Sequence, residues 1–152
     1  MSDKKILILY GTETGNSELL AMDAENLAKE LDFDVIVNGM DEITLSDMQD
    51  AGNVLIVCST WGDGEQPDNA IDLYESVEES DDASMSGVGF AVLALGDTAF
   101  DLFCEAGIQW DNILEEKGGN RISERIDCDV DYEDDAEVWI EDTLNLFKKT
   151  WE

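Results

Sequence analysis

The sequence predicts a three-layer α/β sandwich in which helices cover both faces of a five-stranded parallel sheet. Short, continuously apolar segments alternate with stripes of apolar residues at helical spacing. Several of the apolar segments end in a turn rich in glycine and polar residues. The 152 residues, 43% of them apolar, suit one folded unit with its own core. We therefore expect residues 1–152 to form a single domain.

Continuous apolar character indicates strands that are buried on both faces, as in a parallel sheet. The first such segment reads KKILILY, and the third and fourth read NVLIVCST and VGFAVLAL. The last expected strand alternates between apolar and polar residues, which is typical of a sheet edge. The five expected strands are residues 4–10, 33–37, 53–60, 88–95 and 121–128.

Apolar stripes predict the helices between these strands. After the first strand the stripe consists of Leu20, Ala24, Leu27, Ala28 and Leu31. Similar stripes predict an acidic helix over 67–79, a helix from 103 that ends at the glycines 118–119, and a last helix over 136–151. Alternating strands and helices imply right-handed crossovers, and ligands of such sheets bind beyond the carboxyl ends of the strands.

The charge is strongly negative, with 38 acidic and 8 basic residues and a formal net charge of −30. Such a surface repels nucleic acid and anionic membranes and attracts a basic protein partner. Adaptation to salt, or plain solubility, is the alternative reading of the same charge. The apolar segments are too short to span a bilayer, the N-terminus lacks a secretory pattern, and three cysteines show no paired spacing. We therefore expect a cytoplasmic protein with no membrane partner.

The first candidate loop, residues 11–17, reads GTETGNS and joins a buried strand to a helix. Helix N-terminal amides, the hydroxyls of Thr12, Thr14 and Ser17, and the amide of Asn16 make a nest for an oxyanion. The lysine of triphosphate-binding loops and the Gly-x-Gly-x-x-Gly pattern of dinucleotide sites are absent. This composition fits one terminal phosphate, and a threonine-rich helix cap is the alternative.

The second and third loops carry aromatic residues beside glycines. In residues 60–69, Trp61 offers a face for stacking on a flat ring, or alternatively folds back to plug the end of the sheet. In residues 95–103, Phe100 is placed to offer a second aromatic face, whereas Phe103 heads an apolar helix stripe and fits the core. These two loops therefore favour a planar ligand.

The fourth loop, residues 127–132, is acidic and follows the edge strand. Its carboxylates alternate along the sequence, and such spacing could indicate a calcium-binding loop. The twelve-residue calcium loop with its central glycine is absent, so we expect no metal site.

Three motifs in this order, YGTETGNSE, STWGDGEQPDNA and LALGDTAFDLF, resemble the flavodoxin family, especially the FMN domains of diflavin reductases. The resemblance covers essentially the whole chain. It implies a flavodoxin-like fold with strand order 2-1-3-4-5, one non-covalent FMN, and electron transfer rather than enzymatic turnover. No insertion follows the fourth strand, as in short-chain flavodoxins.

The resemblance also implies which residues bind the cofactor. For the FMN phosphate these are Thr12, Glu13, Thr14, Gly15, Asn16 and Ser17; for the isoalloxazine ring they are Thr60, Trp61, Gly62, Asp63, Gly64, Leu95, Gly96, Asp97, Phe100 and Phe103, with Asp129 close by. Relatives usually carry Tyr at position 100. Because Phe100 still stacks but lacks the hydroxyl, we expect FMN binding to survive and the potentials to differ.

Carboxylates near the expected ring create a negative field that disfavours a second negative charge on the flavin and spares the neutral semiquinone. The sequence therefore predicts well-separated one-electron steps. The resemblance implies that the Gly62 carbonyl turns toward flavin N5–H on reduction, a movement that glycine tolerates best. The carboxylates concerned are Asp63, Glu65, Asp97, Asp101 and Asp129.

The expected partners are the basic faces of two proteins that a monomeric carrier visits in turn. One is a flavodoxin- or ferredoxin-type reductase that takes hydride from a pyridine nucleotide. The other is an acceptor such as a haem-thiolate monooxygenase, because flavodoxins dedicated to a monooxygenase are similar in size and motif style. The alternatives are a flavin-free regulatory or interaction module and a small flavin quinone reductase, which would need its own nicotinamide site.

Overall fold

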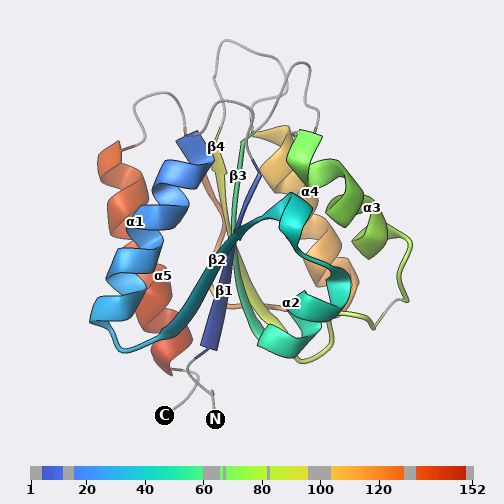
Figure 1. Ribbon diagram of the computed structural model, residues 1–152, viewed down its shortest axis with the longest axis horizontal. Helices are drawn as coiled ribbons and strands as arrows, with labels where there is room; N and C mark the ends of the chain where they lie inside the picture. Colours follow the sequence, from blue (N-terminus) through green and yellow to red (C-terminus); the bar gives the residue numbers. More distant parts are fainter. Residues whose placement is uncertain are drawn as a thin grey trace.

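A computed structural model describes residues 5–11, 16–59, 66, 68–81, 83–95, 104–128 and 133–149 of the chain. The expected three-layer arrangement is confirmed, with a parallel sheet between two layers of helices (Figure 1). The strands are β1 (Lys5–Gly11), β2 (Asp34–Gly39), β3 (Asn53–Ser59), β4 (Gly89–Leu95), β5 (Asn120–Arg121) and β6 (Ile126–Cys128). The sheet order is β2-β1-β3-β4-β5, as the resemblance implied, and β6 also pairs with β4.

Helices α1 and α5 cover one face of the sheet, and α2, α3 and α4 cover the other (Figure 1). The bounds are α1 (Asn16–Glu30), α2 (Leu45–Ala51), α3 (Ile71–Glu78), α4 (Glu105–Glu116) and α5 (Glu133–Lys149), with short 3-10 helices η1 (Met40–Glu42) and η2 (Asp68–Ala70). Each face of the sheet thereby acquires its own apolar core.

The strands alternate their side chains between these two cores. In β1, Ile6 and Ile8 pack toward α1 and α5, while Leu7 and Leu9 pack toward α2 and α3. β4 is buried along its whole length. Burial on both faces explains why these strands read as continuous apolar runs rather than as alternating ones.

The expected fifth strand, residues 121–128, was wrong as a single element, because two short strands, β5 and β6, pair with β4 instead. Polar residues between them bond to α5 rather than to the sheet. The indole nitrogen of Trp139 donates to the backbone carbonyl of Glu124 at 2.9 Å, and the hydroxyl of Thr143 donates to that of Ser123 at 3.3 Å. These contacts draw the segment away from the β4 ladder.

Helix α2, between β2 and β3, was not among the helices predicted from the sequence. Its local signals are a capping box, in which Thr44 and Asp47 exchange hydrogen bonds, and Gly52 in the left-handed conformation at the C-terminal end. Only Met48 and Ala51 of this helix are buried, so the apolar stripe is too short to stand out. Among the described helices, none has both the length and the apolar character needed to cross a membrane.

Candidate functional site

The four candidate loops begin at one edge of the sheet, at the carboxyl ends of neighbouring parallel strands (Figure 1). The register makes these ends level. Gly11 of β1 pairs with Cys58 of β3, Ser59 pairs with Leu95 of β4, and Leu95 pairs with Cys128 of β6. The sheet therefore brings together the starting points of four segments that lie far apart in the sequence.

Most of the predicted cofactor residues lie outside the residues that the structure describes. These are Thr12, Glu13, Thr14, Gly15, Thr60, Trp61, Gly62, Asp63, Gly64, Gly96, Asp97, Phe100, Phe103 and Asp129. Of the others, Leu95 is the last residue of β4, Asn16 is the first residue of α1, and Ser17 is fully buried in the first turn of that helix. The structure therefore describes the strand and helix ends that flank the predicted loops.

The end of β1, where the first loop begins, requires glycine at position 11. A Cβ atom there would lie 3.0 Å from the Cys58 sulfur, 3.1 Å from the Met40 sulfur and 3.2 Å from the Ala70 Cβ. Without that atom, the end of β1 packs closely against β3 and η2. Beyond it, α1 begins at Asn16, and the N-terminus of a helix is rich in backbone amide donors. This donor set fits an anionic group such as a phosphate.

The second loop returns to the fold through two carboxamides, Gln66 and Asn69. Gln66 bonds to α4, and Asn69 donates from Nδ2 to the backbone carbonyl of Tyr10 at 3.2 Å. The sequence analysis assigned no role to either residue. Gln66 finds its α4 partners at sequence separations of 40 to 44 residues, so no local pattern signals it.

The third and fourth loops share a buried cysteine at their base. Cys104, which precedes α4, lies with its sulfur 3.5 Å from the carbonyl of Ala94 and 3.6 Å from that of Cys128. It adopts the left-handed conformation, with φ of 57°. Burial raises the pKa of the Cys104 thiol to about 12 and that of Cys128 to about 11. These thiols are therefore protonated at neutral pH and act as packing groups rather than nucleophiles.

A cluster of charges lies beside β5 and the start of β6. The carboxylate of Asp111 on α4 is almost fully buried and accepts hydrogen bonds from Arg121 Nε at 2.9 Å and Arg125 Nη1 at 3.0 Å. Arg125 also pairs with Asp127, through Nε at 2.7 Å. Both arginines of the chain are thus engaged by one buried carboxylate.

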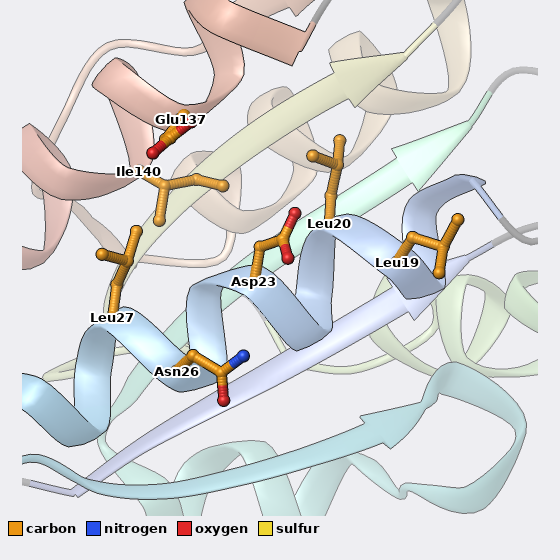
Figure 2. A pocket seen from close by; sticks show the side chains of 7 residues that line it. All are labelled: Leu19, Leu20, Asp23, Asn26, Leu27, Glu137 and Ile140. Carbon is orange, nitrogen blue, oxygen red and sulfur yellow. The ribbon is translucent and has the colours of Figure 1, made fainter.

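A groove of about 430 Å³ lies apart from the strand ends, between α1 and α5. Figure 2 shows Leu20, Leu27 and Ile140 projecting into the space between the helices. The carboxylates of Asp23 and Glu137 also line this groove. Carboxylates repel a phosphate, so the groove does not fit the expected cofactor and belongs to the acidic outer surface. Within the described residues no group of His, Cys, Asp and Glu is arranged to hold a metal ion.

Comparison with known proteins identifies relatives over almost the whole chain. The family model described as flavodoxin matches residues 8–139. The sulfite reductase [NADPH] flavoprotein alpha-component of Bacillus subtilis is 40% identical over 141 residues, 93% of this chain and 23% of that protein. Its counterpart in Vibrio parahaemolyticus is 36% identical over 146 residues, 96% of this chain and 23% of that protein. The chain thus spans about a quarter of the length of these curated relatives.

Solved flavodoxins have the same fold. A flavodoxin of Streptococcus pneumoniae TIGR4 superposes with a TM-score of 0.86 at 27% identity, covering 95% of this chain and 98% of that one. Flavodoxin 2 of Bacillus cereus gives a TM-score of 0.83 at 28% identity, covering 96% of this chain and 99% of that one.

A parallel α/β sheet with level strand ends is the architecture of a class of proteins that bind ligands beyond the carboxyl edge of the sheet. The family match narrows that class. The chain belongs to the flavodoxin family. Flavodoxins are electron-transfer proteins rather than enzymes, and membership of the family gives FMN as the cofactor of this domain. The resemblance to FMN domains of diflavin reductases, expected from the motifs, is confirmed.

The described residues fit FMN where they can be compared with it. The N-terminus of α1 supplies amide donors of the kind that suit a phosphate, and Leu95 ends β4 level with Ser59. No basic side chain is needed, because helix amides supply the positive potential.

Proposed function

We propose that this chain carries single electrons on one FMN from an NAD(P)H-dependent reductase to an acceptor enzyme, in the cytoplasm and as a monomer. The observation that carries the proposal is the level register at the carboxyl ends of β1, β3, β4 and β6. It supports one compact site built from four separate loops within a single domain of residues 1–152. Flavin supplies the one-electron chemistry, and the chain supplies binding, orientation and control of access.

Each loop has its own part in this proposal. Residues 12–17, at the start of α1, hold the phosphate through backbone amides and hydroxyls. Trp61 and Phe100 cover the two faces of the ring, and Gly62 supplies a carbonyl that can turn toward N5. The carboxylates of the loops, including Asp129, resist accumulation of negative charge on the ring.

The partners in the proposal are proteins with basic faces. The formal charge of −30 supports this choice, and so does the groove between α1 and α5, where aliphatic side chains lie beside Asp23 and Glu137. Basic side chains with long alkyl stems complement such a surface in both charge and polarity. Electrostatic attraction of this kind acts mainly on the rate of encounter.

Two classes of acceptor follow from different observations. The motif style favours a haem-thiolate monooxygenase. The 40% identity to a sulfite reductase [NADPH] flavoprotein adds a sulfite-reducing enzyme, and NADPH as the ultimate electron source. Supplying the reduced carrier to one enzyme of each class, and measuring the rate of its reoxidation, distinguishes them.

The primary test is a titration of the apoprotein with FMN followed by stepwise reduction. We expect one FMN per chain, quenching of flavin fluorescence on binding, and two resolved one-electron midpoint potentials. A chain that ignores added FMN would be an interaction module instead. Rapid turnover with a pyridine nucleotide and a quinone, without any reductase, would indicate a quinone reductase.

The role proposed for Gly62 has its own test. Substitution Gly62→Ala restricts the backbone where the carbonyl is proposed to turn. We expect the first midpoint potential to fall while FMN is retained. An unchanged first potential in Gly62→Ala would remove the pivot from the proposal.

A further inference from the structure

Gln66, which immediately follows residues 60–65, is bonded through every polar atom of its side chain. Its Nε2 donates to the backbone carbonyl of Ala106 at 3.0 Å and to Gln109 Oε1 at 3.1 Å. Its Oε1 accepts from Trp110 Nε1 at 2.9 Å and lies 3.6 Å from the Cys58 sulfur. A carboxamide has two donor hydrogens and two acceptor lone pairs, and all four are used here.

The orientation of this carboxamide is fixed by its neighbours. Two acceptors face Nε2, and the indole N–H of Trp110 faces Oε1. In the opposite orientation the amide N–H₂ of Gln66 would face the indole N–H of Trp110, and neither donor would have an acceptor. Trp110 is fully buried and packs edge-on against Tyr74, with ring centroids 5.2 Å apart. Gln66 thus satisfies the polar atom of the largest buried side chain described in the protein.

The α4 helix to which Gln66 is bonded is itself fixed to the sheet. Gly107 lies so close to β4 that an added Cβ atom would stand 2.2 Å from the Cβ of Ala94. This contact lies one residue before Leu95, from which the third loop leaves the sheet. Gln66 is therefore held on a rigid support rather than on a surface helix that can shift.

The other flank of the same segment is also fixed. Asn69 donates to the carbonyl of Tyr10, and Ala70 packs where a Cβ atom of Gly11 would be. The stretch from Gln66 to Ala70 is thereby attached to α4 on one side and to β1 on the other. Upstream, Cys58 of β3 lies next to Gln66 itself. The residues that flank positions 60–65 are held together across the sheet edge.

We propose that Gln66 is a positioning residue for FMN, because it ties Cys58 near the end of β3 to α4 at the edge of the sheet where the cofactor is proposed to bind. The inference rests on the proposed role of that sheet edge in binding FMN. Loss of the Gln66 hydrogen bonds should therefore weaken FMN binding and narrow the separation between the two midpoint potentials.

The test replaces Gln66 by a residue of similar length without polar atoms. In Gln66→Met we expect the dissociation constant of FMN to rise about tenfold, because a change of that size corresponds to the loss of one or two buried hydrogen bonds. We also expect the separation between the two midpoint potentials to narrow. Fluorescence titration of apoprotein with FMN and a potentiometric titration of the holoprotein measure these effects.

The matched control is Gln49→Met. Gln49 is exposed on α2 and donates a single hydrogen bond, at 2.8 Å, to the carbonyl of Ser84, away from the strand ends. It should leave both FMN affinity and the potentials unchanged. Urea unfolding of the apoproteins reports separately on stability, which a purely structural glutamine would affect without changing the potentials.

A second variant decides the matter if Gln66→Met does not fold. Trp110→Phe keeps the ring in the core but removes the N–H that orients the Gln66 oxygen, and it should raise the FMN dissociation constant in the same direction by a smaller factor. The inference is overturned if the folded variants bind FMN like the parent protein and keep its potential separation. If the parent protein itself binds no FMN, the proposed function fails instead.

Discussion

At the scale of single residues, the buried thiol of Cys104 links the ends of β4 and β6, where two of the candidate loops begin. Cys104 contacts the carbonyls of Ala94 and Cys128 and is inaccessible to solvent. Burial raises the thiol pKa from 9.0 to about 12 for Cys104 and to about 11 for Cys128. A folded-state pKa above the unfolded value means that folding favours the protonated thiol. The corresponding stability is present below pH 9 and is lost as the pH rises.

Deprotonation of these thiols should therefore lower the free energy of unfolding at alkaline pH. Between pH 9 and pH 11, each of these two thiols should lower the free energy of unfolding by about 1.4 kcal/mol per pH unit. Urea unfolding at constant ionic strength, repeated across this range, measures the slope. Cys128→Ala should show a shallower slope than the parent protein, because one titrating group is gone. Equal slopes for the two proteins would contradict the assignment.

Residues that reach across the fold were beyond sequence reasoning. The candidate phosphate and aromatic loops could be proposed from the sequence because their residues are consecutive and follow apolar strands, and their roles stay predictions. Gln66, Asn69 and Cys104 act on groups far along the chain, and only the folded register brings them within reach. Ordinary residue types in loops carry no local sign of such partners.

At the scale of elements, the contact between α4 and β4 depends on one glycine. A Cβ atom at Gly107 would lie 2.2 Å from the Cβ and 2.9 Å from the Cα of Ala94. Neither atom can rotate away, since both are fixed to the backbone of a buried strand. The helix can approach the sheet this closely only without a side chain at that position.

Gly107→Ala should consequently destabilise the protein, although alanine favours a helix over glycine by about 1 kcal/mol. We expect a net loss of about 2–3 kcal/mol in the free energy of unfolding, typical of overpacking. Adding Ala94→Gly to this variant should recover much of the loss by making room for the new methyl group. A Gly107→Ala protein as stable as the parent would show that α4 can move away from β4.

The divided edge strand depends on Asp111 in a similar way. This carboxylate holds Arg121 of β5 and Arg125, which precedes β6, at 2.9 and 3.0 Å. Arg121 also lies over the ring of Phe90, 5.7 Å from its centre. One residue of α4 thus fixes both short strands beside β4.

Asp111→Ala should lower the free energy of unfolding by about 2–4 kcal/mol, because it removes a buried carboxylate that accepts hydrogen bonds from two charged groups. Glu141→Ala, at an exposed site on α5, removes the same charge and should change stability by less than about 0.5 kcal/mol. Urea unfolding compares the two variants. Equal stabilities would mean that the arginines find other partners at no cost.

Elements were predictable where burial is extensive. β1, β3 and β4 lie between two helical layers and read as apolar runs, so sequence alone located them. Helix α2 was not predicted because only two of its residues are buried. The edge strand was predicted as one continuous strand because its residues alternate between apolar and polar, and this pattern does not reveal the polar contacts to α5 that interrupt it.

At the scale of the whole molecule, the net charge opposes folding and favours basic partners. With 38 acidic and 8 basic residues, most carboxylates have no opposite charge to pair with. Repulsion among them acts over a Debye length of about 10 Å at 0.1 M salt and about 3 Å at 1 M. Salt therefore screens both the repulsion within the chain and the attraction to a basic partner.

Raising NaCl from 0.05 to 1 M should thus have two opposite effects. The thermal midpoint should increase, by about 2–4 °C for each kcal/mol of repulsion relieved. The rate of electron transfer to a basic acceptor should decrease, as measured by stopped-flow reoxidation. A rate that does not depend on salt would argue that the acidity serves solubility or a saline habitat rather than docking.

The two ends of the described fold lie on the side away from the strand ends where FMN is proposed to bind. β1 starts at Lys5 and α5 finishes at Lys149, both at the bottom of Figure 1, whereas the strands point their carboxyl ends to the top. A linker to an electrode, a surface tether or a fused redox module can be attached at either end without crowding the flavin. The same polypeptide architecture thus suits a freely diffusing shuttle and a covalently tethered one.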